Sequence, residues 1–315
     1  MDDATLLREL EPTVETLLDR HLSTTKEWFP HEVVPYSRGR DAVPGHEWTP
    51  ADADLDGVEL TDAVRSSLIV NLLTEDNLPY YFRSIERMFG ADGAWGTWAR
   101  RWTAEEGRHS MAIYGYLMTT RAVDPVDLER GRMAQVSGGQ TPDPDSPIDG
   151  FIYLTLQELA TRIAHRNTGK LIGDQAGYAV MMRVATDENL HHLFYRDLAS
   201  AAIQMAPNTM MHAIEREVVG FAMPGLGIPG FAAHASAIAK AGVYDLAIHH
   251  DQILVPMLMR HWQIDKLEGL DAEAEQSRER VLARLTKSGR VARRLAERRE
   301  AAASAASADA QLASV

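Results

Sequence analysis

The stretch of sequence that decides the fold reads TAEEGRH at residues 103–109, and a second stretch of the same kind reads ATDENLH at residues 185–191. Each contains a glutamate and a histidine three positions apart. Residues at that spacing share one face of a helix, close enough to bind one metal ion. Because so short a motif is expected about once by chance in a chain rich in Glu and His, the information lies in what precedes each copy.

A single glutamate precedes each Glu-x-x-His at nearly the same distance. Glu75 lies 31 positions before Glu106, and Glu158 lies 30 positions before Glu188. The chain therefore resembles one helical hairpin used twice, a pattern typical of four-helix bundles that hold two iron or two manganese ions. This pattern predicts six ligands: Glu75, Glu106, His109, Glu158, Glu188 and His191. Glu105 is four positions from His109 and is an alternative to Glu106.

The chemistry of these donors supports the same class of site. Four carboxylates balance the charge of two divalent ions, and oxygen and imidazole ligands without sulfur suit iron, with manganese as a substitute. Without metal, the same carboxylates would lie in an apolar core, which is costly unless they bind protons. The alternative is that some of these acids are ordinary surface charges.

Helical periodicity extends over most of the chain, and no run alternates as a strand would. We expect an all-α protein with helices at about 4–27, 60–90, 94–120, 125–136, 150–169, 172–201, 206–219, 231–262 and 271–300. They form a single domain over residues 1–300, with an N-terminal helix and wrapping loop (1–59), a metal-binding bundle (60–201) and flanking helices (206–300). The Ala- and Ser-rich residues 301–315 are expected to be disordered.

Composition excludes several classes of function. The chain has no cysteine, which removes disulfides, thiolate zinc sites and iron–sulfur clusters. Its net charge of −13 argues against a nucleic-acid partner. No apolar run reaches the roughly 18 residues of a membrane span, and the acidic start at Met1-Asp2-Asp3 is unlike a secretory signal. We therefore expect a cytoplasmic protein without a membrane span.

Two residues near the predicted ligands carry further hypotheses. Pro79, four positions after Glu75, removes a hydrogen bond to the Glu75 carbonyl and would distort the helix beside that ligand, although an ordinary kink is the alternative. Thr161 lies three positions after Glu158 and faces the same way. Its hydroxyl would either meet bound oxygen or bond back to its own helix.

Five stretches carry a resemblance to a known family: residues 74–79 (TEDNLP), 98–109 (WARRWTAEEGRH), 157–161 (QELAT), 165–169 (HRNTG) and 187–191 (DENLH). Together they resemble the soluble acyl-carrier-protein desaturases, the plant stearoyl enzymes and their actinobacterial relatives. The similarity runs from about residue 28 to residue 270. It implies a ferritin-like di-iron four-helix bundle core with additional flanking helices.

The resemblance also implies roles for individual residues. It places Glu75, Glu106 and His109 at one iron and Glu158, Glu188 and His191 at the other, with one or more glutamates bridging, and so favours Glu106 over Glu105. Thr161 matches the family's threonine at the oxygen site. Asp187 matches an acid that orients a ligand imidazole, and Trp28 matches a surface tryptophan on the electron path.

The activity that the resemblance implies is removal of two hydrogens from an acyl chain attached to acyl-carrier protein, in fatty acid biosynthesis. Such an enzyme uses O2 and two electrons from a ferredoxin-type donor, and the family is homodimeric. Two alternatives remain: a related di-iron oxygenase or hydroxylase, and a non-catalytic ferritin-like metal-binding protein.

Substrate contacts are predicted in two places. Ser84, Met88, Phe151 and Thr155 are candidates for the acyl pocket, with plain core packing as the alternative; Arg87 would be unusual in such a channel. Residues 278–299 carry nine basic and two acidic side chains. Because acyl-carrier proteins are acidic, Arg290, Arg293 and Arg294 are predicted to help dock them, the alternative being pairing with acidic patches of this bundle or of a second subunit.

Overall fold

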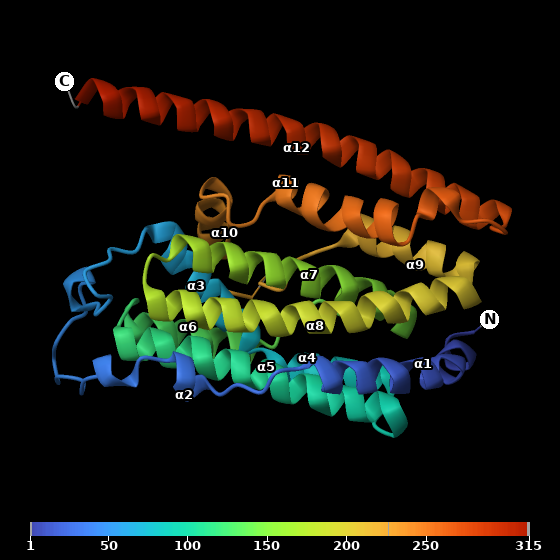
Figure 1. Cartoon of the computed structure of the whole chain (residues 1–315), viewed down its shortest axis with the longest axis horizontal. Coiled ribbons are helices and arrows are strands. Elements are labelled where there is room, and N and C mark those ends of the chain that lie inside the picture. The colour runs from blue at the N-terminus through green and yellow to red at the C-terminus, as the bar shows by residue number, and fades with distance from the viewer. Residues whose placement is uncertain (1, 226, 314–315) are drawn as a thin grey trace.

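The computed structural model describes residues 2–225 and 227–313, and every regular element within these ranges is a helix. The prediction of an all-α fold is confirmed. Figure 1 shows the helices as stacked layers, with the N-terminal helix on one side of the bundle and the C-terminal helix on the other. No helix among the described residues is long and apolar enough to cross a membrane.

The elements follow in this order: α1 (Asp3–Thr24), α2 (Pro30–Val33), η1 (Tyr36–Arg38), η2 (Pro50–Asp52), α3 (Asp62–Glu75), α4 (Leu78–Phe89), α5 (Gly93–Thr120), α6 (Pro125–Gly138), α7 (Pro147–Leu171), α8 (Gln175–Met205), α9 (Pro207–Gly220), α10 (Phe231–Lys240), α11 (Leu246–Ile248), the π-helix η3 (His249–His261), η4 (Ile264–Lys266) and α12 (Ala272–Ala313).

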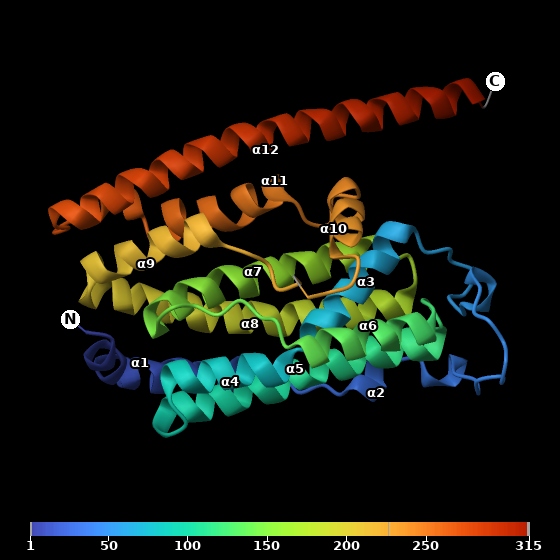
Figure 2. The ribbon, with the colours of Figure 1, turned by 180° about the vertical axis from the view of Figure 1, so that it is seen from behind.

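Helices α3, α5, α7 and α8 form the central bundle. Helix α1 packs on α5 and α8, and α12 packs on α9 and α11 at the opposite side of the molecule. Seen from behind in Figure 2, α4 and α6 cover the remaining face of the bundle. The segment between α1 and α3 extends past one end of the bundle, where Trp48 donates a hydrogen bond to the carbonyl of Arg121 at 3.0 Å.

The apolar core is divided into two clusters. On α5 the first cluster ends at Trp102 and the second begins at Ala112, and on α8 the gap runs from Val184 to Phe194. The predicted ligands of α5 and α8 lie in these gaps. The bundle thus has a buried polar layer enclosed by apolar packing on both sides.

The helix expected at residues 60–90 is interrupted beside Glu75. Helix α3 ends at Glu75 and α4 begins at Leu78, with Pro79 in its first turn. Proline has no N–H group, so it is tolerated at a helix start but cannot continue the hydrogen bonds of the preceding helix. The expected distortion beside Glu75 is therefore present as a helix break.

The C-terminal third differs from expectation in two ways. The predicted helix at 231–262 is divided, because α10 ends at Lys240, Gly242 adopts a positive φ of 71°, and Asp245 caps a new start. Residues 301–315 were expected to be disordered, whereas α12 continues as a helix to Ala313. Alanine has the highest helix propensity, and extending an existing helix needs no new nucleus. Residues 314–315 lie outside the described part of the chain.

Candidate metal centre

The bundle brings the six predicted ligands together from α3, α5, α7 and α8. All six are buried, the most exposed being Glu75 at 7%. Their donor atoms form two groups, and within each group the atoms lie within 4.8 Å of one another. The first group is Glu75, Glu106, His109 and Glu188, and the second is Glu106, Glu158, Glu188 and His191.

Both imidazoles present the same nitrogen to this acid layer. Nδ1 of His109 lies 3.1 Å from Glu106 and 3.7 Å from Glu188. Nδ1 of His191 lies 2.9 Å from Glu106 and 3.7 Å from Glu158. Because Glu106 and Glu188 take part in both groups, they occupy the position that carboxylates bridging two ions would take.

Electrostatics shows that the buried carboxylates of this layer repel one another. Burial, then the negative charges of Glu106 and a second carboxylate, raise the pKa of Glu75 and the pKa of Glu188 well above the usual range. Burial also disfavours ionised Glu106, yet His109 and His191 hold its pKa below normal. Two divalent cations would remove this repulsion, so the donor set fits iron or manganese.

Unpaired atoms support the same conclusion. Oε2 of Glu158 and Oε2 of Glu188 are buried and have no hydrogen-bond partner among the described residues. Leaving such oxygens unpaired is costly. Oε1 of Glu158, in contrast, accepts a hydrogen bond from the Trp102 indole at 3.0 Å. One carboxylate oxygen is therefore held in place while the other remains available to a metal.

Asp187 joins the centre to the N-terminal segment. Its Oδ2 accepts hydrogen bonds from Trp28 Nε1 at 2.9 Å and from Arg108 at 2.6 Å, and lies 3.3 Å from Nε2 of His109. Trp28 is expected at the surface, but only 1% of it is exposed, because it packs in the second apolar cluster and the Arg108 guanidinium lies 4.6 Å from the centre of its ring. The interpretation of a surface tryptophan is therefore wrong, whereas its position beside Asp187 is retained.

Thr161 has the simpler of its two predicted arrangements. Its hydroxyl lies 3.2 Å from the carbonyl of Gln157 and 3.1 Å from that of Glu158, and bonds back to its own helix. The side chain nevertheless lines the cavity that reaches Glu75, Glu106 and Glu188.

This cavity also contains two of the four predicted pocket residues, Ser84 and Met88. Phe151 and Thr155 are not among its lining residues. Phe151 stacks on Phe89, with ring centroids 5.2 Å apart, and the hydroxyl of Thr155 donates to the Phe151 carbonyl at 2.7 Å. The two residues belong to the packed core, which was the stated alternative.

Arg87 does not enter the cavity. It is exposed and pairs with Asp143, which also accepts a hydrogen bond from Ser84 at 2.9 Å. The cavity lining beyond Ser84 is largely apolar, including Leu78, Ile85 and Leu154. Because Arg87 is not among the residues that line the cavity, its presence on α4 does not conflict with an acyl channel there.

Sequence reasoning missed His165, whose Nε2 lies 3.2 Å from Glu75 and 3.4 Å from Glu188. Its position seven residues, or two helical turns, after Glu158 is the signal that could have identified it. Glu105, the alternative ligand, does not face the acid layer; it contacts His191 from the outer side, with Oε2 2.9 Å from Nε2.

A buried layer of carboxylates and imidazoles in a helical bundle defines the class of protein as a ferritin-like metal-binding bundle. The family model described as fatty acid desaturase matches residues 2–312, so the chain belongs to the fatty acid desaturase family.

Relatives agree with this assignment. The chain is 43% identical over 291 residues to the Mycobacterium tuberculosis protein named "Putative acyl-(acyl-carrier-protein) desaturase DesA1", covering 89% of this chain and 84% of the relative. It is 31% identical over 301 residues to the rice protein named acyl-(acyl-carrier-protein) desaturase 6, chloroplastic, covering 88% of this chain and 70% of the relative. The resemblance found in the sequence is confirmed.

A solved structure supports the fold. The X-ray structure titled "putative acyl-ACP desaturase DesA2" from Mycobacterium tuberculosis H37Rv superimposes with a TM-score of 0.69 at 24% identity. The match covers 87% of this chain and 99% of the other.

Proposed function

We propose that this protein is an O2-dependent di-iron desaturase that introduces a double bond into an acyl chain attached to acyl-carrier protein. The observation that carries the proposal is the pair of donor groups sharing Glu106 and Glu188 at the end of a largely apolar cavity. The names of the relatives, at up to 43% identity, support the same substrate class.

The six buried residues would hold two iron ions, and the same donors would also accept manganese. When bound, two irons supply the capacity to activate O2 and to oxidise an unactivated C–H bond. Glu75 and Glu188 would release protons on metal binding, because a carboxylate ligand must be ionised. Trp102 fixes Glu158 through the indole hydrogen bond, which limits how this ligand can turn.

The cavity residues would position the acyl chain and exclude water. Leu78, Ile85 and Met88 provide apolar contacts along one wall, and Leu154 and Thr161 line it from α7. Fixing one C–H bond next to the metal layer converts a random encounter into an oriented one. The reacting carbon is therefore selected by how deep the chain can enter.

Electrons from a ferredoxin-type donor would enter through Trp28. The indole, the Asp187 carboxylate and the His109 imidazole form one hydrogen-bonded chain that ends at a proposed ligand. Although Trp28 is buried, its neighbour Phe29 is 45% exposed. We propose that a donor docks over this segment.

The carrier protein would dock on α12. Arg290, Arg293 and Arg294 are exposed, and none has an ion-pair partner in the part of the chain that the structure describes. In contrast, Arg278 pairs with Glu275 and Arg280 pairs with Glu215 of α9. Pairing within the protein is thus seen at the start of α12. We propose that Arg290, Arg293 and Arg294 meet the carrier, with a second subunit as the alternative partner.

The test is reconstitution of the whole protein with ferrous iron, a ferredoxin with its reductase, and a panel of acyl-carrier-protein thioesters. Mass spectrometry of the product should show loss of two hydrogens. Gain of one oxygen would instead establish a hydroxylase, and iron binding without carrier-dependent O2 consumption would establish a non-catalytic metal protein. Gel filtration of the same sample tests the expected homodimer.

A further inference from the structure

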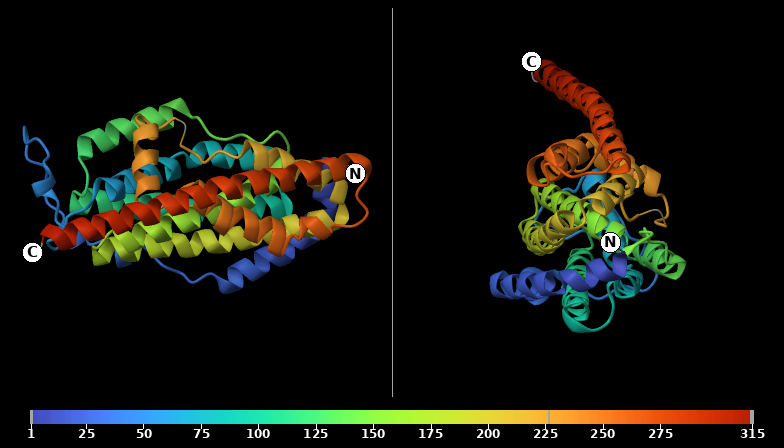
Figure 3. Two further views of the ribbon diagram at one scale, coloured as in Figure 1. Left: turned by 90° about the horizontal axis from the view of Figure 1, so that it is seen from above. Right: turned by 90° about the vertical axis from the view of Figure 1, so that its right-hand side faces the viewer.

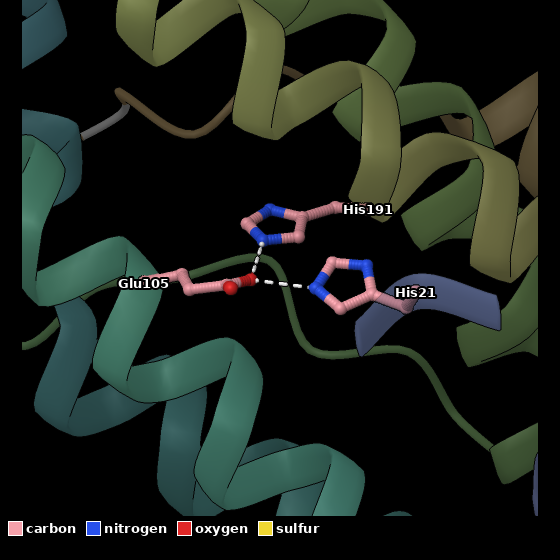
Figure 4. A group of neighbouring side chains, drawn as sticks. All are labelled: His21, Glu105 and His191. Atoms are coloured by element: carbon pink, nitrogen blue, oxygen red, sulfur yellow. Dashed lines mark hydrogen bonds and ion pairs between the residues drawn. The ribbon is translucent and has the colours of Figure 1, made fainter. Parts of the chain in front are cut away.

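A second buried cluster lies behind the ligand His191. Oε2 of Glu105 is 2.9 Å from Nε2 of His191 and 2.9 Å from Nε2 of His21, as Figure 4 shows. All three residues are at most 3% exposed. His21 belongs to α1, a helix that contributes none of the six proposed ligands.

The protonation of this cluster follows from its donors and acceptors. An ionised carboxylate only accepts hydrogen bonds, so both imidazoles must donate through Nε2–H. The guanidinium of Arg101 lies 2.5 Å from the other oxygen of Glu105, Oε1. The proton on Nε2 leaves Nδ1 of His191 free to bind a metal.

The arrangement repeats one found at the other imidazole. Glu105 precedes the ligand Glu106 as Asp187 precedes the ligand Glu188. Each of these acids meets Nε2 of one ligand histidine and the guanidinium of one arginine. Each also accepts a third N–H group from the N-terminal segment, which for Asp187 comes from Trp28. His21 is the counterpart of Trp28 in the second half of the bundle.

We propose that His21 is a positioning residue of the metal centre, acting through Glu105 to fix the ring orientation and the tautomer of His191. Helix α1 is then a functional part of the iron site and not only a cover for the bundle. Partners of this kind commonly change metal affinity 10- to 100-fold when they are removed.

This inference rests on the iron centre of the proposed function, but it does not depend on the substrate. Three donors within 4.8 Å also allow the cluster itself to hold an ion. Oε2 of Glu105 already contacts both Nε2 atoms at 2.9 Å, and Arg101 adds positive charge beside Oε1, so we expect two metal ions per chain and not three. Binding of a third ion at His21 would overturn the positioning role.

The test uses ferrous-ion titration of the whole protein without oxygen, followed by Mössbauer spectroscopy of 57Fe. His21→Phe keeps a ring beside Trp98, whose centroid lies 5.0 Å away, but removes the donor. We expect the affinity for one of two ions to fall about tenfold and one iron signal to change while the other persists. His21→Gln, which retains an N–H donor, should restore much of the affinity. Glu105→Gln should perturb the same iron signal more strongly.

His192→Gln is the matched control. His192 is the next residue on α8 and is also buried, but it bonds the carbonyl of Thr155 at 2.9 Å and not Glu105. The proposal is wrong if a folded His21→Phe variant binds both ions with parental affinity and spectra, or if it changes no more than His192→Gln. If the His21→Phe variant does not fold, the same iron affinities and spectra are measured on His21→Leu, and the same outcomes support or refute the proposal. A parent protein that binds no iron would instead refute the di-iron centre.

Discussion

Nε2 of His165 lies 3.2 Å from Oε1 of Glu75, and this contact joins α7 to the last residue of α3. Burial and the nearby His109 lower the pKa of His165 to about 3, so its ring is neutral at physiological pH. A neutral imidazole can donate one N–H to a carboxylate without adding charge to the centre. His165 therefore holds Glu75 in place where the helix is interrupted.

His165→Leu should weaken binding of one ferrous ion by roughly 10-fold or more, because Glu75 loses the donor that orients it. Equilibrium titration against a chelator measures the effect. His212→Leu is a suitable control, since His212 bonds Ser277 at a distance from the centre. Equal affinities in both variants would show that the break after Glu75 is stable without His165.

Removing a ligand should separate metal binding from folding. Glu188→Gln replaces a buried acid whose charge is repelled by Glu106 and Glu158, so the metal-free variant should unfold at a temperature no lower than that of the metal-free parent. The parent should gain about 2.7 kcal/mol when the free metal reaches 100 times its dissociation constant, and the variant should gain much less. Calorimetry with ferrous or manganous ion, reversed by chelator, measures both. Glu9→Gln, at an exposed position, should behave as the parent.

The six ligands could be predicted because each Glu-x-x-His motif is short and lies within one helix. In a helix, the spacing in sequence determines which side chains share a face. The position of a residue along a helix predicts the face on which its side chain lies, but not which residues of the neighbouring helices it contacts. Phe151 lies two turns before Glu158 and shares its face, yet it stacks on Phe89 outside the cavity. His21 is separated from Glu105 by 84 positions and belongs to no motif. Its role depends on how α1 packs, which local sequence does not specify.

For the C-terminal residues, the composition of the segment was misleading because the effect of the preceding helix was left out. An Ala/Ser segment without an apolar stripe has nothing to bury, and this pattern alone favours disorder. The preceding helix supplies the nucleus, however, and alanine then extends it at low cost. Composition was a poor guide here because it ignored the neighbouring segment.

Cavity depth should set the preferred acyl length. Met88 lines the cavity, and Met88→Ala would open space for a longer chain. Gly150→Ala should favour shorter chains, because the added Cβ would lie 2.8 Å from the sulfur of Met88 and push that side chain toward the cavity. Ratios of kcat/KM for two chain lengths should change about 10-fold in opposite directions. Phe151→Leu, outside the cavity, should lower stability and leave the ratio unchanged; a shift there would mean that the cavity boundary is misplaced.

Glu217 should make stability depend on pH. Burial and the charge of Asp149 raise its pKa to about 7, against the opposing effect of Arg216. Because the folded-state pKa is above the unfolded value of about 4.5, its contribution is fully present below pH 4.5 and is lost as pH rises through 7. Urea denaturation between pH 4.5 and 8 should therefore show a smaller loss of stability for Glu217→Gln than for the parent. Parallel profiles would show that Glu217 is ionised in the folded protein throughout this range.

Charge reversal on α12 should impair carrier binding in a salt-dependent way. Replacing Arg290, Arg293 and Arg294 with Glu changes the sign of an exposed patch that would attract an acidic carrier, and such steering typically alters association rates by 10-fold or more. The apparent KM for acyl-carrier substrate should rise at least 10-fold at low salt and much less at high salt, where the charges are screened.

A second triple variant, Arg8, Lys170 and Arg183 to Glu, provides the control for this change in charge. It alters the net charge equally at exposed positions on α1, α7 and α8. If the docking surface is α12, this variant keeps a near-normal KM, because the reversed charges lie on other elements. Equal effects of the two triple variants would mean that only total charge matters. Loss of the dimer or of the fold in the α12 variant alone would show that these arginines hold the protein together instead of binding the carrier.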